Sequence, residues 1–149
     1  MEDKNLRGFK YSLPMSLLRA REAVMKNFIP SLQEHKLSAP QWRVIRALQE
    51  DNGLDISKLS VRCYLMMPSL SRIIKNLESR SLIERTTSDR DQRVSIISLT
   101  KGGRQLYELV APKSVERYEY ITKKFGYGKL ELLYELLAEL VEKIDEGDE

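Results

Sequence analysis

The sequence predicts a mostly α-helical chain with one small β-hairpin. Apolar residues recur at helical spacing over most of the chain. Only two short runs, SLIERTTS and RVSIISLT, are rich in the residues that favour strands. The 149 residues are 42% hydrophobic and 32% charged, which suits one globular domain or a compact domain with an extension.

Composition excludes several classes of protein. No apolar run approaches the roughly 20 residues that a membrane-spanning helix needs, and the first residues lack a signal-peptide layout. We therefore expect a cytoplasmic protein. The single cysteine, Cys63, excludes a disulfide within the chain, and with one histidine, His35, it argues against a metal centre. No cofactor is expected.

Charge is distributed unevenly along the chain. The net charge is +3, but residues 62–104 hold nine basic and four acidic side chains, a local charge of +5. Residues 130–149 hold eight acidic side chains and one lysine, a local charge of −7. A basic centre and an acidic end predict one surface that binds a polyanion and another that avoids it.

The first third of the chain is expected to form an arm and two helices. The arm covers the first 11 residues, and apolar spacing predicts one helix from about Ser12 to His35. A second helix is predicted in SAPQWRVIRALQ, where Ser38 is a good N-cap and Gln41 completes a capping box. A short third helix follows, with Asp55 as its cap.

The next predicted helix, PSLSRIIKNLES, has two contrasting faces. Apolar residues at i, i+3, i+4 and i+7 form one stripe: Leu70, Ile73, Ile74 and Leu77. Small, hydroxylic and cationic residues occupy the other side, with no carboxylate before Glu78: Pro68, Ser69, Ser71, Arg72, Lys75 and Asn76. An ordinary solvated face mixes both signs of charge. A face without carboxylates is typical of a helix that lies against DNA phosphates and base edges, so these six residues are predicted to bind DNA.

The charged stretch SDRDQR joins the two predicted strands and forms a hairpin tip. A short helix, a basic helix and a charged hairpin in this order make a winged helix-turn-helix arrangement. The hairpin tip can reach the narrow, negative minor groove, where arginine is favoured. We assign Arg90 this contact and expect Asp91 to hold Arg93 in one orientation. The two arginines can exchange roles in this scheme.

The last third of the chain predicts two more helices. The first runs from Lys101 towards Phe125, with Pro112 marking a kink or break, and Gly126 and Gly128 separate the two. The last helix carries a broad apolar stripe: Leu130, Leu133, Leu137, Leu140 and Ile144. Such a stripe needs a partner, either a second copy of the chain or another part of the same chain.

Residues 68–103 resemble the MarR family of winged-helix regulators. The matching signatures are SR at 71–72, LE at 77–78, LIER at 82–85, DxR at 91–93 and LT at 99–100. The resemblance implies a homodimer, formed by the N- and C-terminal helices, that binds palindromic double-stranded operator DNA. It divides the chain into an arm and dimerisation helix (1–36), a winged helix-turn-helix domain (37–100) and C-terminal dimerisation helices (101–149).

Roughly residues 15–140 also resemble the members of this family that repress 4-hydroxyphenylacetate degradation. The specific elements are RARE at 19–22, PQWR at 40–43 and MPSL at 67–70. This closer resemblance implies a repressor of aromatic catabolism. Its effector is then an aromatic carboxylic acid such as 3,4-dihydroxyphenylacetate or 4-hydroxyphenylacetate.

Five residues are candidates for binding that acid. Arg19 and Arg21 lie in an otherwise apolar helix, where they are either snorkelling or paired, or form a carboxylate clamp. Trp42 is either a core residue or the wall of an aromatic slot, and Arg43 lies beside it. His35 either ends its helix or hydrogen-bonds the ligand. The resemblance puts the pocket between the dimerisation helices and the winged domain, near Arg21, Trp42 and Arg43.

Three other functions compete with a ligand-responsive repressor. Cys63, next to Arg62, is either a small buried hydrophobe or the thiol of a redox-sensing regulator of the same fold. A winged-helix protein-interaction module is a further alternative. An enzyme is not expected, because the sequence has no Gly-rich phosphate loop, no HExxH and no set of residues that supplies a nucleophile and its base.

Overall fold

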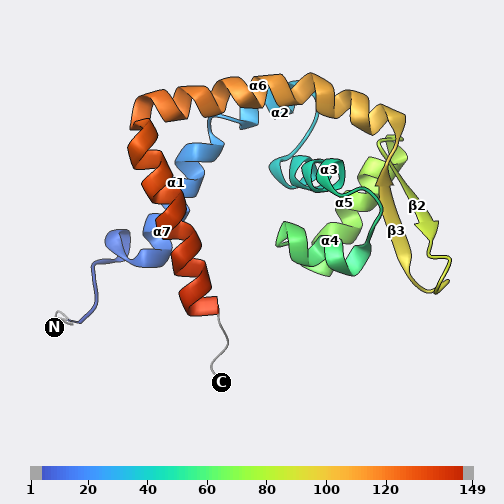
Figure 1. Ribbon diagram of the computed structural model, residues 1–149, viewed down its shortest axis with the longest axis horizontal. Helices are drawn as coiled ribbons and strands as arrows, with labels where there is room; N and C mark the ends of the chain where they lie inside the picture. Colours follow the sequence, from blue (N-terminus) through green and yellow to red (C-terminus); the bar gives the residue numbers. More distant parts are fainter. Residues whose placement is uncertain (1–4, 146–149) are drawn as a thin grey trace. The chain divides into compact units, whose positions relative to one another are not determined.

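A computed structural model describes residues 5–145 of the chain (Figure 1). The described residues are mostly helical with a small antiparallel sheet, as predicted. The chain divides into two compact units between Lys113 and Ser114. In chain order the elements are η1 (Phe9–Tyr11), α1 (Leu13–Met25), α2 (Ile29–Glu34), α3 (Ala39–Glu50), β1 (Leu54–Asp55), α4 (Ile56–Cys63), α5 (Met67–Ser79), β2 (Ile83–Thr87), β3 (Ser95–Leu99), α6 (Lys101–Phe125) and α7 (Tyr127–Asp145).

The first unit has a core formed by α2–α5, the sheet and the first half of α6. Fully buried side chains come from each of these parts: Leu32, Ile45, Leu48, Leu59, Leu70, Ile74, Leu77, Ile97 and Val110. The predicted caps are present. Ser38 Oγ accepts from Gln41 N at 3.2 Å, and Gln41 Oε1 accepts from Ser38 N at 2.9 Å. Asp55 Oδ1 accepts from Lys58 N at 2.8 Å, which fixes the start of α4.

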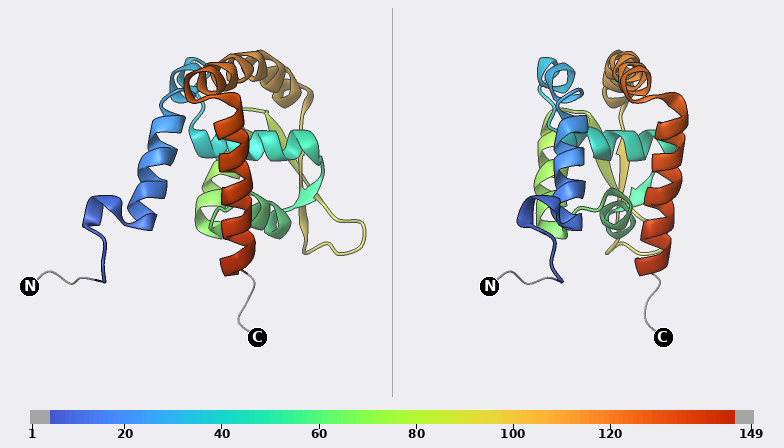
Figure 2. Two further views of the ribbon diagram at one scale, coloured as in Figure 1. Left: turned by 60° about the vertical axis from the view of Figure 1, so that its left-hand side comes forward. Right: turned by 90° about the vertical axis from the view of Figure 1, so that its left-hand side faces the viewer.

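The predicted hairpin is present, with β2 and β3 antiparallel and Ile83 opposite Leu99. Its tip projects beyond the cluster of α3, α4 and α5 (Figures 1 and 2). The sheet also has a third strand that the sequence pattern did not predict. This strand, β1, pairs with β3 and puts Leu54 opposite Ile97. Two residues are too short for an alternating pattern, so no periodicity marked them.

The prediction of one helix from Ser12 to His35 is wrong. The helix ends at Met25, and α2 starts at Ile29 after a turn in which Phe28 N donates to Met25 O at 2.9 Å. Pro30 explains the break, because in a continuous helix its ring would clash with the carbonyl four residues earlier.

Two expectations about the C-terminal helices also need correction. Of the kink or break expected at Pro112, the break is absent, because α6 continues through this residue to Phe125. Gly126, with φ 107°, separates α6 from α7, whereas Gly128 lies inside α7. Glycine adopts this left-handed φ without steric cost. No helix among the described residues is long and apolar enough to cross a membrane.

Three helices of the first unit end in the same way, with a left-handed residue followed by leucine. The left-handed residues after α2, α4 and α5 are Lys36, Tyr64 and Ser81, with φ of 55°, 53° and 60°. In each case the leucine N–H donates to the carbonyl five residues earlier: Leu37 to Leu32, Leu65 to Ser60 and Leu82 to Leu77. This is the Schellman ending, which usually has glycine at the left-handed position.

Each unit also contains a helix with an apolar face that the described chain leaves exposed. In the first unit, α1 has no buried residue and exposes Leu13, Leu17, Leu18 and Val24. In the second unit, α7 has no buried residue and exposes Leu132, Leu133, Tyr134, Leu136, Leu137, Val141 and Ile144. Contiguous apolar surface of this kind is typical of an interface.

Candidate nucleic-acid interface

The packing of α5 fixes which of its faces is turned outward. Leu70, Ile74 and Leu77 are fully buried in the core of the first unit. Since successive helical residues turn by about 100°, this burial turns the opposite face outward. The outward face carries the predicted DNA contacts, of which four are exposed and two half-buried: exposed Pro68, Arg72, Lys75 and Asn76, and half-buried Ser69 and Ser71.

The beginning of α5 is suited to an anion. Its first turn contains no acidic residue, and its N-cap, Met66, provides no side-chain hydrogen bond. Backbone N–H groups at a helix start carry partial positive charge when no side chain caps them. Arg72 and Lys75 add full positive charges, and neither side chain makes a hydrogen bond or ion pair with the described part of the chain. The helix therefore presents donors and cations together.

Among the predicted DNA contacts on α5, Asn76 is held by a side chain from another described helix. Its Oδ1 accepts from Gln41 Nε2 at 3.0 Å, so the start of α3 is joined to α5. The amide nitrogen of Asn76 remains available to donate. Sequence spacing alone did not show this contact, because the two residues belong to different helices.

The hairpin tip holds one arginine and leaves the other free. Asp91 Oδ1 accepts from Arg93 N at 3.0 Å and from Arg93 Nε at 3.2 Å. Arg93 nevertheless keeps a side chain that is 92% exposed. Arg90 is exposed, and its side chain makes no hydrogen bond or ion pair with residues 5–145. The geometry thus distinguishes Arg93, which Asp91 orients, from Arg90, whose side chain has no polar partner among the described residues.

The five candidates for the acid pocket lie in different surroundings. Arg19 and Arg21 are both exposed on α1, and residues two apart on a helix point to opposite sides, so they cannot clamp one carboxylate together. Arg19 Nη1 donates to Lys10 O at 3.5 Å. Trp42 is 8% exposed and stacks on Tyr107 of α6, with ring centroids 5.5 Å apart, so it packs in the core.

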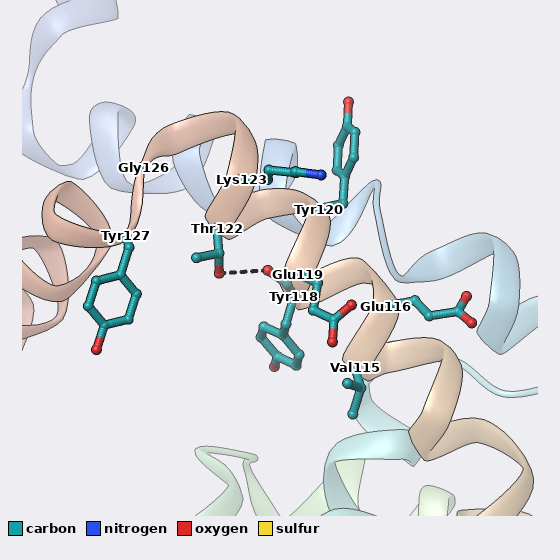
Figure 3. A pocket seen from close by; sticks show the side chains of 9 residues that line it. All are labelled: Val115, Glu116, Tyr118, Glu119, Tyr120, Thr122, Lys123, Gly126 and Tyr127. Carbon is teal, nitrogen blue, oxygen red and sulfur yellow. Dashed lines mark hydrogen bonds between the residues drawn. The ribbon is translucent and has the colours of Figure 1, made fainter.

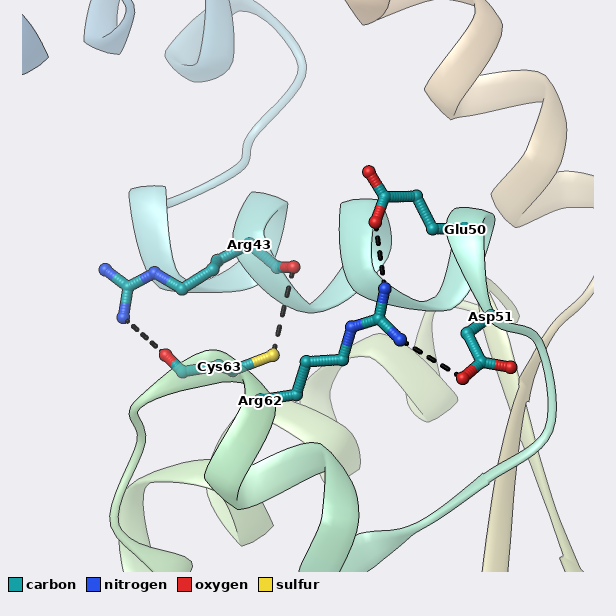
Figure 4. Close-up of polar contacts among 5 residues, drawn as sticks. All are labelled: Arg43, Glu50, Asp51, Arg62 and Cys63. Atoms are coloured by element: carbon teal, nitrogen blue, oxygen red, sulfur yellow. Dashed lines mark hydrogen bonds and ion pairs between the residues drawn. The ribbon is translucent and has the colours of Figure 1, made fainter. Parts of the chain in front are cut away.

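Arg43 and Cys63 contact each other across the α3–α4 interface (Figure 4). Arg43 Nη1 donates to Cys63 O at 3.0 Å, and Cys63 Sγ donates to Arg43 O at 3.9 Å. The thiol is 1% exposed, and this burial raises its pKa above the ordinary 9.0 despite the nearby cations of Arg43 and Arg62. A buried, protonated thiol is a poor nucleophile, which argues against the redox-sensor alternative.

Arg62 forms a second link between the same two helices. It bridges Glu50 at 2.8 Å and Asp51 at 3.1 Å (Figure 4). It is therefore a structural clamp on the surface rather than a free cation. His35 is half-buried, and its carbonyl accepts from Arg80 Nη2 at 3.1 Å.

Arg46 is a cation that the sequence pattern did not single out. It is exposed and lies four residues after Trp42 on α3, so the two residues share one side of the helix. The spacing of four residues from Trp42 could have marked Arg46 in the sequence as a further candidate for the acid.

The second unit has an open hollow of about 790 Å³ at the corner between α6 and α7. Tyr118 and Tyr127 point to one side of this corner and Tyr120 to the other, while Thr122 Oγ1 donates to Tyr118 O at 2.8 Å (Figure 3). None of the five acid-pocket candidates lines this hollow.

Comparisons with known proteins identify the family. The MarR family model matches residues 37–95. The transcriptional regulator FarR of Neisseria gonorrhoeae is 38% identical over 136 residues, which cover 91% of this chain and 92% of that protein. The homoprotocatechuate degradative operon repressor of Escherichia coli is 38% identical over 130 residues, which cover 87% of this chain and 88% of the repressor.

A solved structure of a similar protein also aligns with this chain. The crystal structure of NadR in complex with 4-hydroxyphenylacetate aligns with a TM-score of 0.77 and 37% identity, and covers 91% of this chain and 96% of that one. The predicted winged-helix architecture and the resemblance to the homoprotocatechuate repressor are therefore confirmed. These relatives are named as regulators and not as enzymes, as predicted. The chain belongs to the MarR family of transcriptional regulators.

Proposed function

We propose that the chain is a cytoplasmic, ligand-responsive repressor that binds palindromic operator DNA as a homodimer. An aromatic carboxylic acid, such as 3,4-dihydroxyphenylacetate or 4-hydroxyphenylacetate, releases it from DNA. Residues 37–100 bind DNA, and residues 1–36 and 101–149, whose first four and last four residues lie outside the described structure, form the dimer. The observation that carries this proposal is the outward face of α5, which presents Arg72 and Lys75 without a carboxylate.

In this proposal α5 enters the major groove. Arg72 donates to a base edge, where a guanidinium binds guanine with two hydrogen bonds. Lys75, Asn76 and the hydroxyls of Ser69 and Ser71 contact phosphates or bases, while the exposed ring of Pro68 packs against the backbone. Arg90 enters the adjacent minor groove, and Arg93, oriented by Asp91, contacts the phosphates beside it.

Dimerisation explains the apolar faces of α1 and α7. Leu17 on α1 and Leu136 on α7 are examples of apolar residues that are exposed in the single chain. A second copy buries them at about 25 cal/mol per Å² of apolar area. A two-fold dimer then presents two copies of α5 to half-sites about one helical turn of DNA apart, which requires a palindromic operator.

The effector assignment rests on relatives and on residue chemistry. The Escherichia coli relative is named for homoprotocatechuate degradation, and NadR was crystallised with 4-hydroxyphenylacetate. An aromatic acid needs an aromatic wall and a cation. We assign the buried ring of Trp42, stacked on Tyr107, as the wall and Arg43 as the carboxylate partner. His35 and either Arg21 or Arg19 supply the other polar groups, since the two arginines point to opposite sides of α1. An acid that binds better to a dimer with the wrong α5 spacing lowers DNA affinity by population shift.

The proposed DNA contact of Arg72 is tested by measuring the affinity of Arg72→Ala for operator DNA and for an unrelated duplex. If Arg72 reads a base, the variant weakens operator binding by about 1–3 kcal/mol, roughly 5- to 150-fold, and changes unrelated DNA binding much less. Glu131, on α7, offers a matched control, since Glu131→Ala lies outside the DNA-binding region. Equal losses on both duplexes would contradict base reading and make Arg72 a phosphate contact.

The proposed acid pocket is tested by calorimetric titration of 4-hydroxyphenylacetate into three variants: Arg43→Gln, Arg21→Gln and Arg46→Gln. We expect the largest loss of acid affinity in Arg43→Gln, because it removes the assigned carboxylate partner. Operator binding without acid should remain in Arg21→Gln. A loss confined to Arg46→Gln would transfer the carboxylate to Arg46, and unchanged affinity in all three variants would disprove the pocket.

A further inference from the structure

Arg80 joins the end of the DNA-binding helix to the end of α2. It is the C-cap residue of α5. Its Nη1 donates to Lys36 O at 2.9 Å, and its Nη2 donates to His35 O at 3.1 Å. One guanidinium therefore binds two consecutive carbonyls that lie far away in the sequence.

The two acceptors are suited to a cation. Carbonyls at the end of a helix lack partners within the helix and carry partial negative charge. Lys36 adopts a left-handed φ of 55°, so its carbonyl is turned out of the helical direction by a backbone conformation that costs energy. The planar guanidinium donates to both carbonyls from a rigid fork, whereas a lysine ammonium is a point charge on a flexible stem.

The Arg80 fork, its two hydrogen bonds to the carbonyls of His35 and Lys36, is one of several contacts that hold α2 and α5 in place. Leu32 anchors α2 in the core, and Glu34 pairs with Lys113 of α6. On α5, one turn before Arg80, Asn76 accepts from Gln41 of α3. The Arg80 fork therefore connects the last turn of α2 directly to α5, without passing through the apolar core.

We propose that Arg80 is a positioning residue that transmits the state of α2 to the DNA-binding helix. This inference rests on the proposed function. His35 is assigned to the acid through its imidazole, while its carbonyl already accepts from Arg80. A shift of this turn when the acid binds pulls on the end of α5 and changes its angle to DNA. Without the fork, the acid still binds, but its effect on DNA affinity is reduced.

The test measures the operator Kd with and without saturating 4-hydroxyphenylacetate in Arg80→Lys. Lysine keeps the charge but not the fork. Coupling between two sites is typically 5- to 150-fold. We expect the ratio of the two Kd values to fall at least about fivefold relative to the unmodified protein. The affinity of the free variant for the acid should stay within about twofold, which shows that the variant is folded and its pocket intact.

Arg62→Lys is the matched control. Arg62 also makes two guanidinium contacts at the surface, but to Glu50 and Asp51, and it makes no hydrogen bond or ion pair with α2 or α5 among the described residues. We expect this variant to keep the full Kd ratio. An unchanged ratio in Arg80→Lys, equal losses in both variants, or loss of acid binding by the free Arg80→Lys protein would each overturn the inference. An unmodified protein that the acid does not release from DNA would instead contradict the proposed function.

Discussion

Replacing Ser81 with glycine should stabilise the protein. Ser81 lies directly after the C-cap of α5 and has a left-handed φ of 60°. Its side chain is exposed, while Leu82 N donates to Leu77 O at 3.0 Å to complete the helix end. The substitution therefore removes steric strain without removing a buried group.

The magnitude follows from two opposing terms. A left-handed conformation costs a residue with a Cβ atom roughly 1–2 kcal/mol. Glycine loses more backbone conformational entropy on folding than serine does, which lowers the free energy of unfolding by about 0.5–1 kcal/mol. The difference between the two terms is about 0–1.5 kcal/mol, so the free energy of unfolding should rise by up to about 1.5 kcal/mol and the melting temperature by up to about 6 °C for a chain of this length.

Ser79→Gly is the control for this prediction. Ser79 is the last residue of α5, and its Oγ donates to Asn76 O at 2.7 Å. Glycine within a helix costs about 0.5–1 kcal/mol, so the same substitution two residues earlier should destabilise. Urea unfolding at one fixed protein concentration measures both, since the stability of the proposed dimer would depend on concentration. A loss of stability in Ser81→Gly equal to that in Ser79→Gly would refute the reasoning.

Three further predictions concern single sites. Gly103→Ala should destabilise by at least about 2 kcal/mol, because a Cβ atom there would overlap the carbonyl oxygen of Leu82; an unchanged urea midpoint would contradict this close approach. Lys113 lowers the pKa of Glu34 below its ordinary value of 4.5, so the pair stabilises above that pH and its contribution is lost as the pH falls through the lowered pKa. The difference in urea midpoint between the unmodified protein and Lys113→Gln should therefore be small and positive at pH 7 and absent near pH 2, and a pH-independent difference would be inconsistent with the ion pair. Cys63, the only cysteine of the sequence, should react with Ellman's reagent slowly in the folded protein and fully in urea, whereas rapid reaction in the folded state would revive the redox alternative.

The sequence predicted those parts of the fold that follow from periodicity and local capping. The stripe of Leu70, Ile74 and Leu77 fixed the orientation of α5, because three buried residues on one side leave only one outward face. Ser38 and Asp55 were predicted as caps, since their hydrogen bonds involve residues only three positions away.

The features that the sequence did not predict depend on particular backbone angles or on distant partners. Tyr64 and Ser81 end helices at positions where glycine is the usual signal. The Arg80 fork and the Gln41–Asn76 bond each join separate helices, so no local pattern contains them. The broken N-terminal helix was predictable from Pro30, but the apolar spacing around it favoured a continuous helix.

The candidate site divides in the same way. The outward, carboxylate-free face of α5 was predicted because it requires only the sign and spacing of charges along the helix, and its contact with DNA stays a prediction. The proposed acid pocket depends on which side chains meet in space, and Trp42 stacks on Tyr107 of a helix that lies far along the chain. Arg19 and Arg21 were grouped by sequence proximity, although a helix turns them to opposite sides.

The central claim is that an aromatic acid releases this protein from specific DNA. The most direct measurement is a titration of the protein on its own promoter DNA, at two salt concentrations, with and without 3,4-dihydroxyphenylacetate or 4-hydroxyphenylacetate. The account predicts tight binding that weakens as salt rises and is released by at least one of these acids. Binding of equal strength on unrelated DNA, or specific binding that neither acid changes, would contradict it.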